Sequence, residues 1–144
     1  MAYTASLLIC DVLTSPKEEF VRDAALKMRA EKAGCVVVTD GKKIIGIFSE
    51  RDLLNRVVAE GLDPSSVALS EVMTPNPITI EASDSLNKAF SLLADGRFRH
   101  LPVTDKDEVV GICSLSDMAK VLRQVYMDDK YLQYFADSIQ RKKK

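Results

Sequence analysis

Each half of the chain contains two short apolar runs that are separated by a polar turn. In the first half, the run Cys35–Thr39 reaches Asp40–Gly41, and a second apolar run covers Ile44–Phe48. An Asp-Gly pair between two such runs predicts a β-hairpin. Both runs are apolar at successive positions, which is typical of strands in a sheet that is covered on both faces.

Helical spacing of apolar residues flanks this hairpin. A helix is predicted from about Glu18, because apolar residues recur three and four positions apart from Val21 to Met28. A second helix is predicted over residues 49 to about 60. Gly61–Ser66 then forms a linker, since a glycine after a helix and a following proline are stop signals.

The second half carries the same order of elements. The pattern predicts an extended run at Pro77–Ile80, a helix from Ser83 with Leu86, Ala89, Phe90 and Leu93 on one face, strands at Arg99–Val103 and Glu108–Cys113, and a helix from Ser114 past Leu122.

A shift of the sequence by 65 positions superimposes the two halves. Val36–Asp40 then falls on Leu101–Asp105, and Gly46–Asp52 falls on Gly111–Asp117. No gap is needed from Thr14 onward. An internal repeat decides the architecture, and one copy of about 50 residues would be marginally stable alone. We therefore expect an α+β protein made of two β-α-β-β-α repeats packed sheet to sheet.

The repeats set the expected boundaries. The first repeat covers residues 7–60 and the second covers residues 70–125, while residues 126–144 form a C-terminal helix and a basic tail. In the tail helix, Tyr131, Tyr134, Phe135 and Ile139 lie at helical spacing.

Composition narrows the functional classes. The chain has 47% hydrophobic and 28% charged residues, and 20 basic residues nearly cancel 21 acidic ones, so nucleic acid is an unfavoured partner. The three cysteines are widely spaced and the chain has one histidine, which argues against disulfides and against a metal site. No apolar run is long enough to span a membrane, and no signal peptide is evident. These features predict a cytoplasmic protein.

Catalytic motifs are not evident, and we expect a protein that is not an enzyme. His100, the only histidine, has no nucleophile or acid partner suggested by the sequence. It is expected to pack against the strand or to line a cleft rim. No P-loop or other catalytic signature occurs.

Each repeat carries Ser-x-x-Asp at the start of a helix, as Ser49–Asp52 and Ser114–Asp117. The serine predicts a helix cap, worth about 1 kcal/mol. Free amides at a helix start also attract phosphate, and a nearby carboxylate accepts hydrogen bonds from ribose hydroxyls. Capping and nucleotide binding are compatible roles for these residues.

The two Gly-to-Asp segments, together with Met73–Pro77 and Arg99–Val103, resemble the CBS domain family. The resemblance implies two repeats about a pseudo-twofold axis and an adenosine-type ligand (AMP, ADP, ATP or a related compound) between them. It also implies a homodimer, a regulatory role with a possible protein partner, and no obligatory cofactor. An interaction module with empty or vestigial clefts remains the alternative.

The resemblance assigns residues to two clefts that each combine both repeats. The stronger cleft joins Ser49, Arg51, Asp52, Thr74, Ile78, Thr79 and Arg99, with His100 at its rim; the weaker joins Ser114, Ser116, Asp117, Thr14, Gly34 and Cys35. Arginine offers a phosphate several donors and serine offers one, which makes the clefts unequal.

The first repeat lacks the Met-Thr-Pro opening. Its Asp11–Thr14 segment matches either Glu71–Thr74 with a five-residue deletion or Asn76–Thr79 without a gap, and we prefer the second.

Overall fold

The computed structural model describes residues 4–5, 10–95 and 99–126 of the 144-residue chain. The expected C-terminal helix and tail lie outside these residues, apart from Tyr126. Within the described residues, no helix is long and apolar enough to cross a membrane.

The first repeat contains β1 (Thr14–Pro16), α1 (Val21–Glu31), β2 (Cys35–Asp40), β3 (Lys43–Ser49), α2 (Glu50–Asp52) and the π-helix η2 (Leu53–Val58). The second half contains α3 (Leu69–Val72), β4 (Thr74–Pro75), β5 (Ile80–Glu81), α4 (Leu86–Ala94), β6 (His100–Asp105), β7 (Glu108–Ser114) and α5 (Leu115–Tyr126). The expected α+β architecture with two β-α-β-β-α repeats is confirmed.

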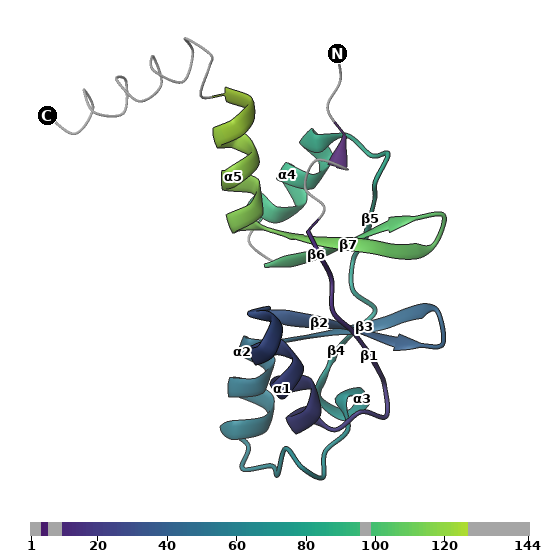
Figure 1. The fold of residues 1–144 in the computed structure, drawn as a ribbon, viewed down its shortest axis with the longest axis vertical. Coiled ribbons are helices and arrows are strands. Elements are labelled where there is room, and N and C mark those ends of the chain that lie inside the picture. The colour runs from purple at the N-terminus through teal and green to yellow at the C-terminus, as the bar shows by residue number, and fades with distance from the viewer. Residues whose placement is uncertain (1–3, 6–9, 96–98, 127–144) are drawn as a thin grey trace, which may run out of the picture.

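Two facing sheets form the centre of the molecule, and helices cover their outer sides (Figure 1). One sheet has the order β1-β2-β3-β4 and the other has the order β5-β6-β7. In β2, Val36 and Val38 pack in the core beneath α1, while Val37 faces the other repeat in a cluster with Cys35 and Ile112. Because successive strand residues point to opposite faces, a continuous apolar strand serves both the helix layer and the inter-repeat interface.

Strand register confirms the gap-free alignment of the two repeats. In the parallel pair β1–β2, Ser15 lies opposite Val38, and in the parallel pair β5–β6, Ile80 lies opposite Val103. Both partners shift by 65 positions. Thr14 is therefore the structural counterpart of Thr79.

Each repeat is completed by the segment that precedes the other repeat in the chain. Strand β4 pairs with β3 of the first repeat, and Leu69 and Val72 are buried in that repeat's core. In the other direction, Ala5 is buried in the core of the second repeat, and Cys10 bridges Ile112 of β7. The repeats thus exchange their leading segments, an arrangement that the sequence repeat does not reveal.

Some element boundaries differ from the predicted ones. The helix predicted from residue 49 begins as α2 and continues as a π-helix, with an i→i+5 hydrogen bond of 2.9 Å from Ala59 N to Leu54 O. Helix α4 is capped by Ser85, whose Oγ accepts from Lys88 N at 3.1 Å, and not by Ser83. Helix α3 was not predicted, because its four residues are too few for a periodic pattern.

Candidate ligand cleft

Both Ser-x-x-Asp segments form capping boxes. In the first repeat, Asp52 N donates to Ser49 Oγ at 3.3 Å, while Asp52 Oδ2 accepts from the Ser49 main-chain N at 3.0 Å and from its hydroxyl at 3.2 Å. In the second repeat, Asp117 and Ser114 make the same contacts at 3.3, 2.9 and 2.9 Å. The capping role predicted for both serines is confirmed.

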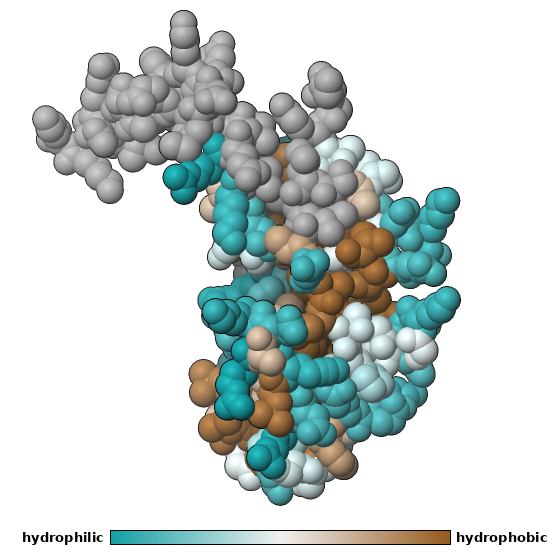
Figure 2. All heavy atoms as spheres, in the orientation of Figure 1, coloured by the Kyte–Doolittle hydropathy of each residue, from teal (hydrophilic) through white to brown (hydrophobic). Residues whose placement is uncertain are grey.

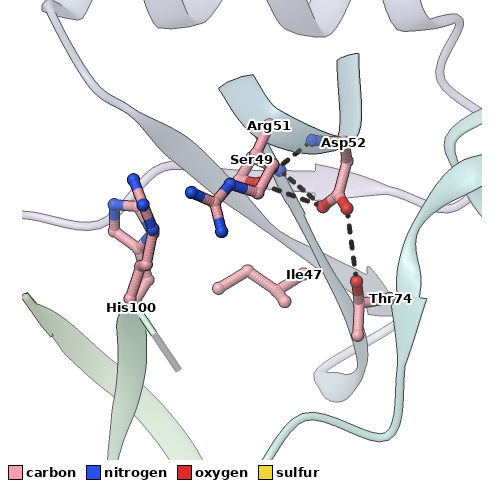
Figure 3. A pocket seen from close by; sticks show the side chains of 7 residues that line it. Ile47, Ser49, Arg51, Asp52, Thr74 and His100 are labelled. Atoms are coloured by element: carbon pink, nitrogen blue, oxygen red, sulfur yellow. Dashed lines mark hydrogen bonds between the residues drawn. The ribbon is translucent and has the colours of Figure 1, made fainter. Parts of the chain in front are cut away.

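A cavity of about 170 Å³ lies where the first capping box meets the second half of the chain. It is lined by Ile47, Ser49, Arg51, Asp52, Thr74, Arg99 and His100. In Figure 3, Asp52 and Thr74 lie on one side of this cavity, His100 lies on the other, and Ile47 lies between them. The Arg51 guanidinium reaches from the Asp52 side toward His100. The cavity therefore has an acidic end and a basic end.

Four elements supply these side chains. Strand β3 carries Ile47 and ends at Ser49, helix α2 carries Arg51 and Asp52, and β4 supplies Thr74. Arg99 directly precedes β6, which begins at His100. The cavity exists only because β4 crosses to the first repeat while β6 approaches from the opposite sheet.

Asp52 is held by contacts that sequence reasoning missed in part. Its side chain is 13% exposed, and its Oδ1 lies 3.4 Å from Thr74 Oγ1 and 3.6 Å from Arg56 Nε. Arg56 also donates through Nη1 to Met73 O at 2.6 Å and to Val72 O at 3.3 Å. Arg56 therefore links the Asp52 carboxylate to the main chain of Val72 and Met73, just before β4. The only signal for this contact in the sequence is the i, i+4 spacing of Asp52 and Arg56.

His100 is half-buried at the junction of the two repeats. Burial lowers its pKa below the usual range, and the positive charge of Arg99 acts in the same direction. The carboxylates of Glu50 and Asp117 oppose this shift of the pKa. A Cβ atom at Gly34 would lie 3.3 Å from His100 Nε2, so Gly34 gives the imidazole room rather than providing a side chain of its own.

Two residues assigned to the stronger cleft do not line this cavity. Ile78 is 45% exposed and does not line the cavity, and Thr79 lines a separate hollow of about 530 Å³ with Lys43 and Thr104. The chain leaves β4 through Asn76, whose φ is 49°, and crosses to the other sheet. The chain therefore passes from one sheet to the other between Pro75 and Ile80.

Thr14 lies in the equivalent hollow, of about 290 Å³, with Thr39 and Glu108. Its assignment to the weaker cleft, like that of Thr79 to the stronger one, stays a prediction. In the structure, Ile112 pairs with Cys10 just as Ile47 pairs with Thr74, so Cys10 takes the place of Thr74.

The region around Asp117 differs chemically from the cavity. The Asp117 carboxylate acts on Cys10, whereas Asp52 Oδ1 lies 3.4 Å from Thr74 Oγ1. Burial, followed by the influence of Asp117, raises the pKa of the Cys10 thiol. Burial also raises the pKa of Cys35 to about 12. The positions that correspond to Arg51, Arg99 and His100 are occupied by Ser116, Gly34 and Cys35. None of these three residues is basic, so they do not reproduce the basic end of the cavity.

No group of three or more His, Cys, Asp or Glu side chains among residues 4–5, 10–95 and 99–126 is placed to hold a metal ion. The polar groups of the cavity are instead suited to a ligand that both donates and accepts hydrogen bonds.

Two repeats with facing sheets and a polar cavity between them define a tandem-repeat module. Residues 5–59 and 69–124 match the CBS domain family, and the chain belongs to that family. It is 34% identical to the CBS domain-containing protein CBSCBSPB3 of Arabidopsis thaliana over 111 residues, which are 76% of this chain and 20% of that protein. The chain thus spans about a fifth of the length of that relative.

Solved structures with the same fold include two CBS proteins. A putative signal-transduction protein with CBS domains from Burkholderia ambifaria superimposes with a TM-score of 0.76 at 29% identity, over 90% of this chain and 97% of that one. The CBS domain protein PAE2072 from Pyrobaculum aerophilum, complexed with AMP, superimposes with a TM-score of 0.71 at 28% identity, over 80% and 88% of the two chains.

Proposed function

We propose that the chain is a regulatory, non-catalytic module that binds an adenine nucleotide in the cavity between its repeats. One observation carries this proposal: a carboxylate from the first repeat and basic side chains from both repeats line a single cavity. The AMP complex of the Pyrobaculum aerophilum protein supports the same ligand class.

The two ends of the cavity match the two polar parts of a nucleotide. Asp52 accepts hydrogen bonds from the ribose hydroxyls. Its Oδ1 gives up the 3.4 Å contact with Thr74 Oγ1 when it binds them. Arg51, Arg99 and His100 donate to the phosphate, and arginine does so through its planar fork of N–H groups. Ile47 supplies an apolar surface for the base.

Regulation follows from the position of the cavity. Arg51 and Asp52 belong to the first repeat, and Arg99 and His100 belong to the second, so a bound nucleotide favours the arrangement in which both sets face it. A ligand shifts an equilibrium only by its differential affinity for the two states. The nucleotide thus stabilises one packing of the repeats, and a partner protein reads that packing.

Thermal unfolding tests the binding. Adenosine, AMP, ADP, ATP, NAD and S-adenosylmethionine are added separately, and the midpoint is compared with that of the ligand-free chain. At a ligand concentration of about 100 times the dissociation constant, the gain is about 2.7 kcal/mol, which raises the midpoint by several degrees. A shift with AMP or another adenine nucleotide supports the proposal. If none of the compounds produces a shift, the clefts are vestigial and the chain is an interaction module.

Two matched variants locate the site. Asp52→Asn and Asp117→Asn each weaken an equivalent capping box, so the two have similar costs to the unliganded protein. The ligand-induced shift, measured against each variant's own midpoint, should be largely lost in Asp52→Asn and retained in Asp117→Asn. Equal shifts in the two variants would place the ligand outside this cavity.

A further inference from the structure

Arg56 of η2 joins two segments of the chain through one guanidinium group. Its Nη1 donates to Met73 O at 2.6 Å and to Val72 O at 3.3 Å, and its Nε lies 3.6 Å from Asp52 Oδ1. The residue after these two carbonyls is Thr74, whose Oγ1 lies 3.4 Å from the same Oδ1. Arg56 is not among the residues that line the cavity. It therefore acts on the cavity through Asp52 and Thr74.

The two carboxylate oxygens of Asp52 have different partners. Oδ2 accepts from the main-chain N of Ser49 at 3.0 Å and from the Ser49 hydroxyl at 3.2 Å, so the capping box occupies this oxygen. Among the described residues, the partners of Oδ1 are Thr74 at 3.4 Å and Arg56 at 3.6 Å, and both distances are long for a hydrogen bond. Oδ1 therefore retains acceptor capacity for a ligand hydroxyl, and Arg56 and Thr74 restrain its position.

The second repeat has the capping box without the arginine. With the 65-residue offset confirmed by strand register, the counterpart of Arg56 is Val121. A capped helix start forms there all the same, so the capping box does not require Arg56. The helix also differs: α5 is an α-helix, whereas the first repeat has a π-helical turn that Ala59 N closes on Leu54 O. Such turns are rare and occur frequently at functional sites.

Apolar side chains pack where the two sheets meet. Val37 and Ile112 lie in one buried cluster with Ile47 packed against it, and Figure 2 shows hydrophobic side chains gathered between the two halves of the molecule. This packing is compatible with a range of positions, because the hydrophobic effect has no direction. A guanidinium has its donors in a rigid plane and restrains its partners more narrowly. Arg56 is therefore suited to hold the segment before β4 at a fixed distance from α2.

We propose that Arg56 is a positioning residue for ribose, which holds Asp52 and Thr74 where Asp52 Oδ1 accepts a hydrogen bond from the 2′-hydroxyl of a nucleotide. The inference rests on the proposed function, because it concerns the ribose end of the same cavity. His100 lies on the opposite side of the cavity from Asp52 and Thr74 (Figure 3). Loss of the Arg56 guanidinium should therefore weaken the ribose contacts and leave the phosphate contacts in place.

Isothermal titration calorimetry of the full chain with AMP and with 2′-deoxy-AMP tests the proposal. The original chain should bind AMP at least about tenfold more tightly, because the deoxy compound lacks a hydrogen bond to a charged group. Arg56→Met keeps an apolar stem and removes the guanidinium. In this variant the dissociation constant for AMP should rise about fivefold, and that for 2′-deoxy-AMP should stay within about twofold. A merely structural role of Arg56 would weaken both nucleotides equally and leave their ratio unchanged.

Two further variants separate the contact from the charge. Arg22→Met removes the same charge from an exposed position of α1, and both dissociation constants should stay within about twofold of the original values. Arg56→Lys keeps the charge but lacks the planar set of donors, so the ratio of the two constants should stay below about half of the original ratio. Full recovery of the ratio with lysine, or an unchanged ratio in Arg56→Met, would overturn the inference and leave the nucleotide site intact.

Hydrogen exchange measured by NMR tests the contact in the absence of nucleotide. Asn76 N donates to Ile45 O at 3.0 Å directly after β4, so exchange of this amide reports on the pairing of β4 with β3. The amide should exchange about fivefold faster in Arg56→Met than in Arg22→Met or in the original chain. Equal rates would show that Arg56 does not hold this segment. If the original chain binds neither AMP nor 2′-deoxy-AMP, the proposed function fails and this inference fails with it.

Discussion

Gly46 is a position where the segment that contains β4 lies close to β3. It lies in β3, opposite Val38 on one side and Pro75 on the other. A Cβ atom there would overlap the Met73 sulfur, and it would lie 2.9 Å from Met73 Cγ and 3.0 Å from Thr74 O. Glycine therefore allows the crossing segment to close on the first repeat. We expect Gly46→Ala to destabilise the protein by pushing this segment outward.

The size of the destabilisation depends on the two groups that the new methyl group would meet, the Met73 side chain and the Thr74 carbonyl. The thioether of Met73 is flexible and can adopt another rotamer, whereas the Thr74 carbonyl moves only with β4. Added volume in a well-packed site costs about 1–3 kcal/mol, and both obstacles act here, so we expect a loss of about 2 kcal/mol. For a domain of this size, that loss lowers the thermal midpoint by roughly 5–10 °C.

Urea denaturation followed by circular dichroism measures this loss, and a double-mutant cycle with Met73→Ala separates the two obstacles. In the Met73→Ala background, only the Thr74 carbonyl remains close to the new methyl group, and Gly46→Ala should cost about 1 kcal/mol. A cost below about 0.5 kcal/mol in the original chain, or the same cost in both backgrounds, would refute the reasoning.

Three further predictions concern the charged, titratable and thiol groups. Arg56→Ala should lower the free energy of unfolding by about 1–2 kcal/mol. This is half the loss expected for a fully buried contact, because the Arg56 side chain is 45% exposed. The matched variant Arg22→Ala should change the free energy of unfolding by less than about 0.5 kcal/mol. The pKa of His100 is lower in the folded than in the unfolded protein, so its contribution to stability is complete above about pH 6.5 and is lost as the pH falls through the folded pKa. His100→Gln should therefore reduce the pH dependence of the free energy of unfolding below about pH 6.5. The same pH dependence in the variant and in the original chain would contradict this prediction. Burial raises the pKa of Cys35 and Cys113 to about 12, so Ellman's reagent at pH 8 should modify Cys10 in the folded chain and all three cysteines only after unfolding.

Much of the fold could be predicted from the sequence because the same pattern occurs twice. A hairpin signal at Asp40–Gly41 and apolar runs on both sides of it correspond to β2 and β3, and the copy 65 residues later corresponds to β6 and β7. The helix starts at Ser49 and Ser114 were also predicted, since capping depends on residues three positions apart. These are local interactions, and a local interaction requires particular residue types at fixed spacings along the chain.

The sequence by itself determined the duplication, the order of elements and the two acidic helix starts. The family resemblance also placed Thr74 with Asp52, as the structure does. Tertiary structure decided the other neighbours: the exchange of leading segments brings Cys10 near Asp117, and Ile78 and Thr79 do not line the cavity. The physical reason is that the path of a crossing segment depends on packing between distant parts of the chain. Those contacts impose no spacing or residue pattern on the segment itself.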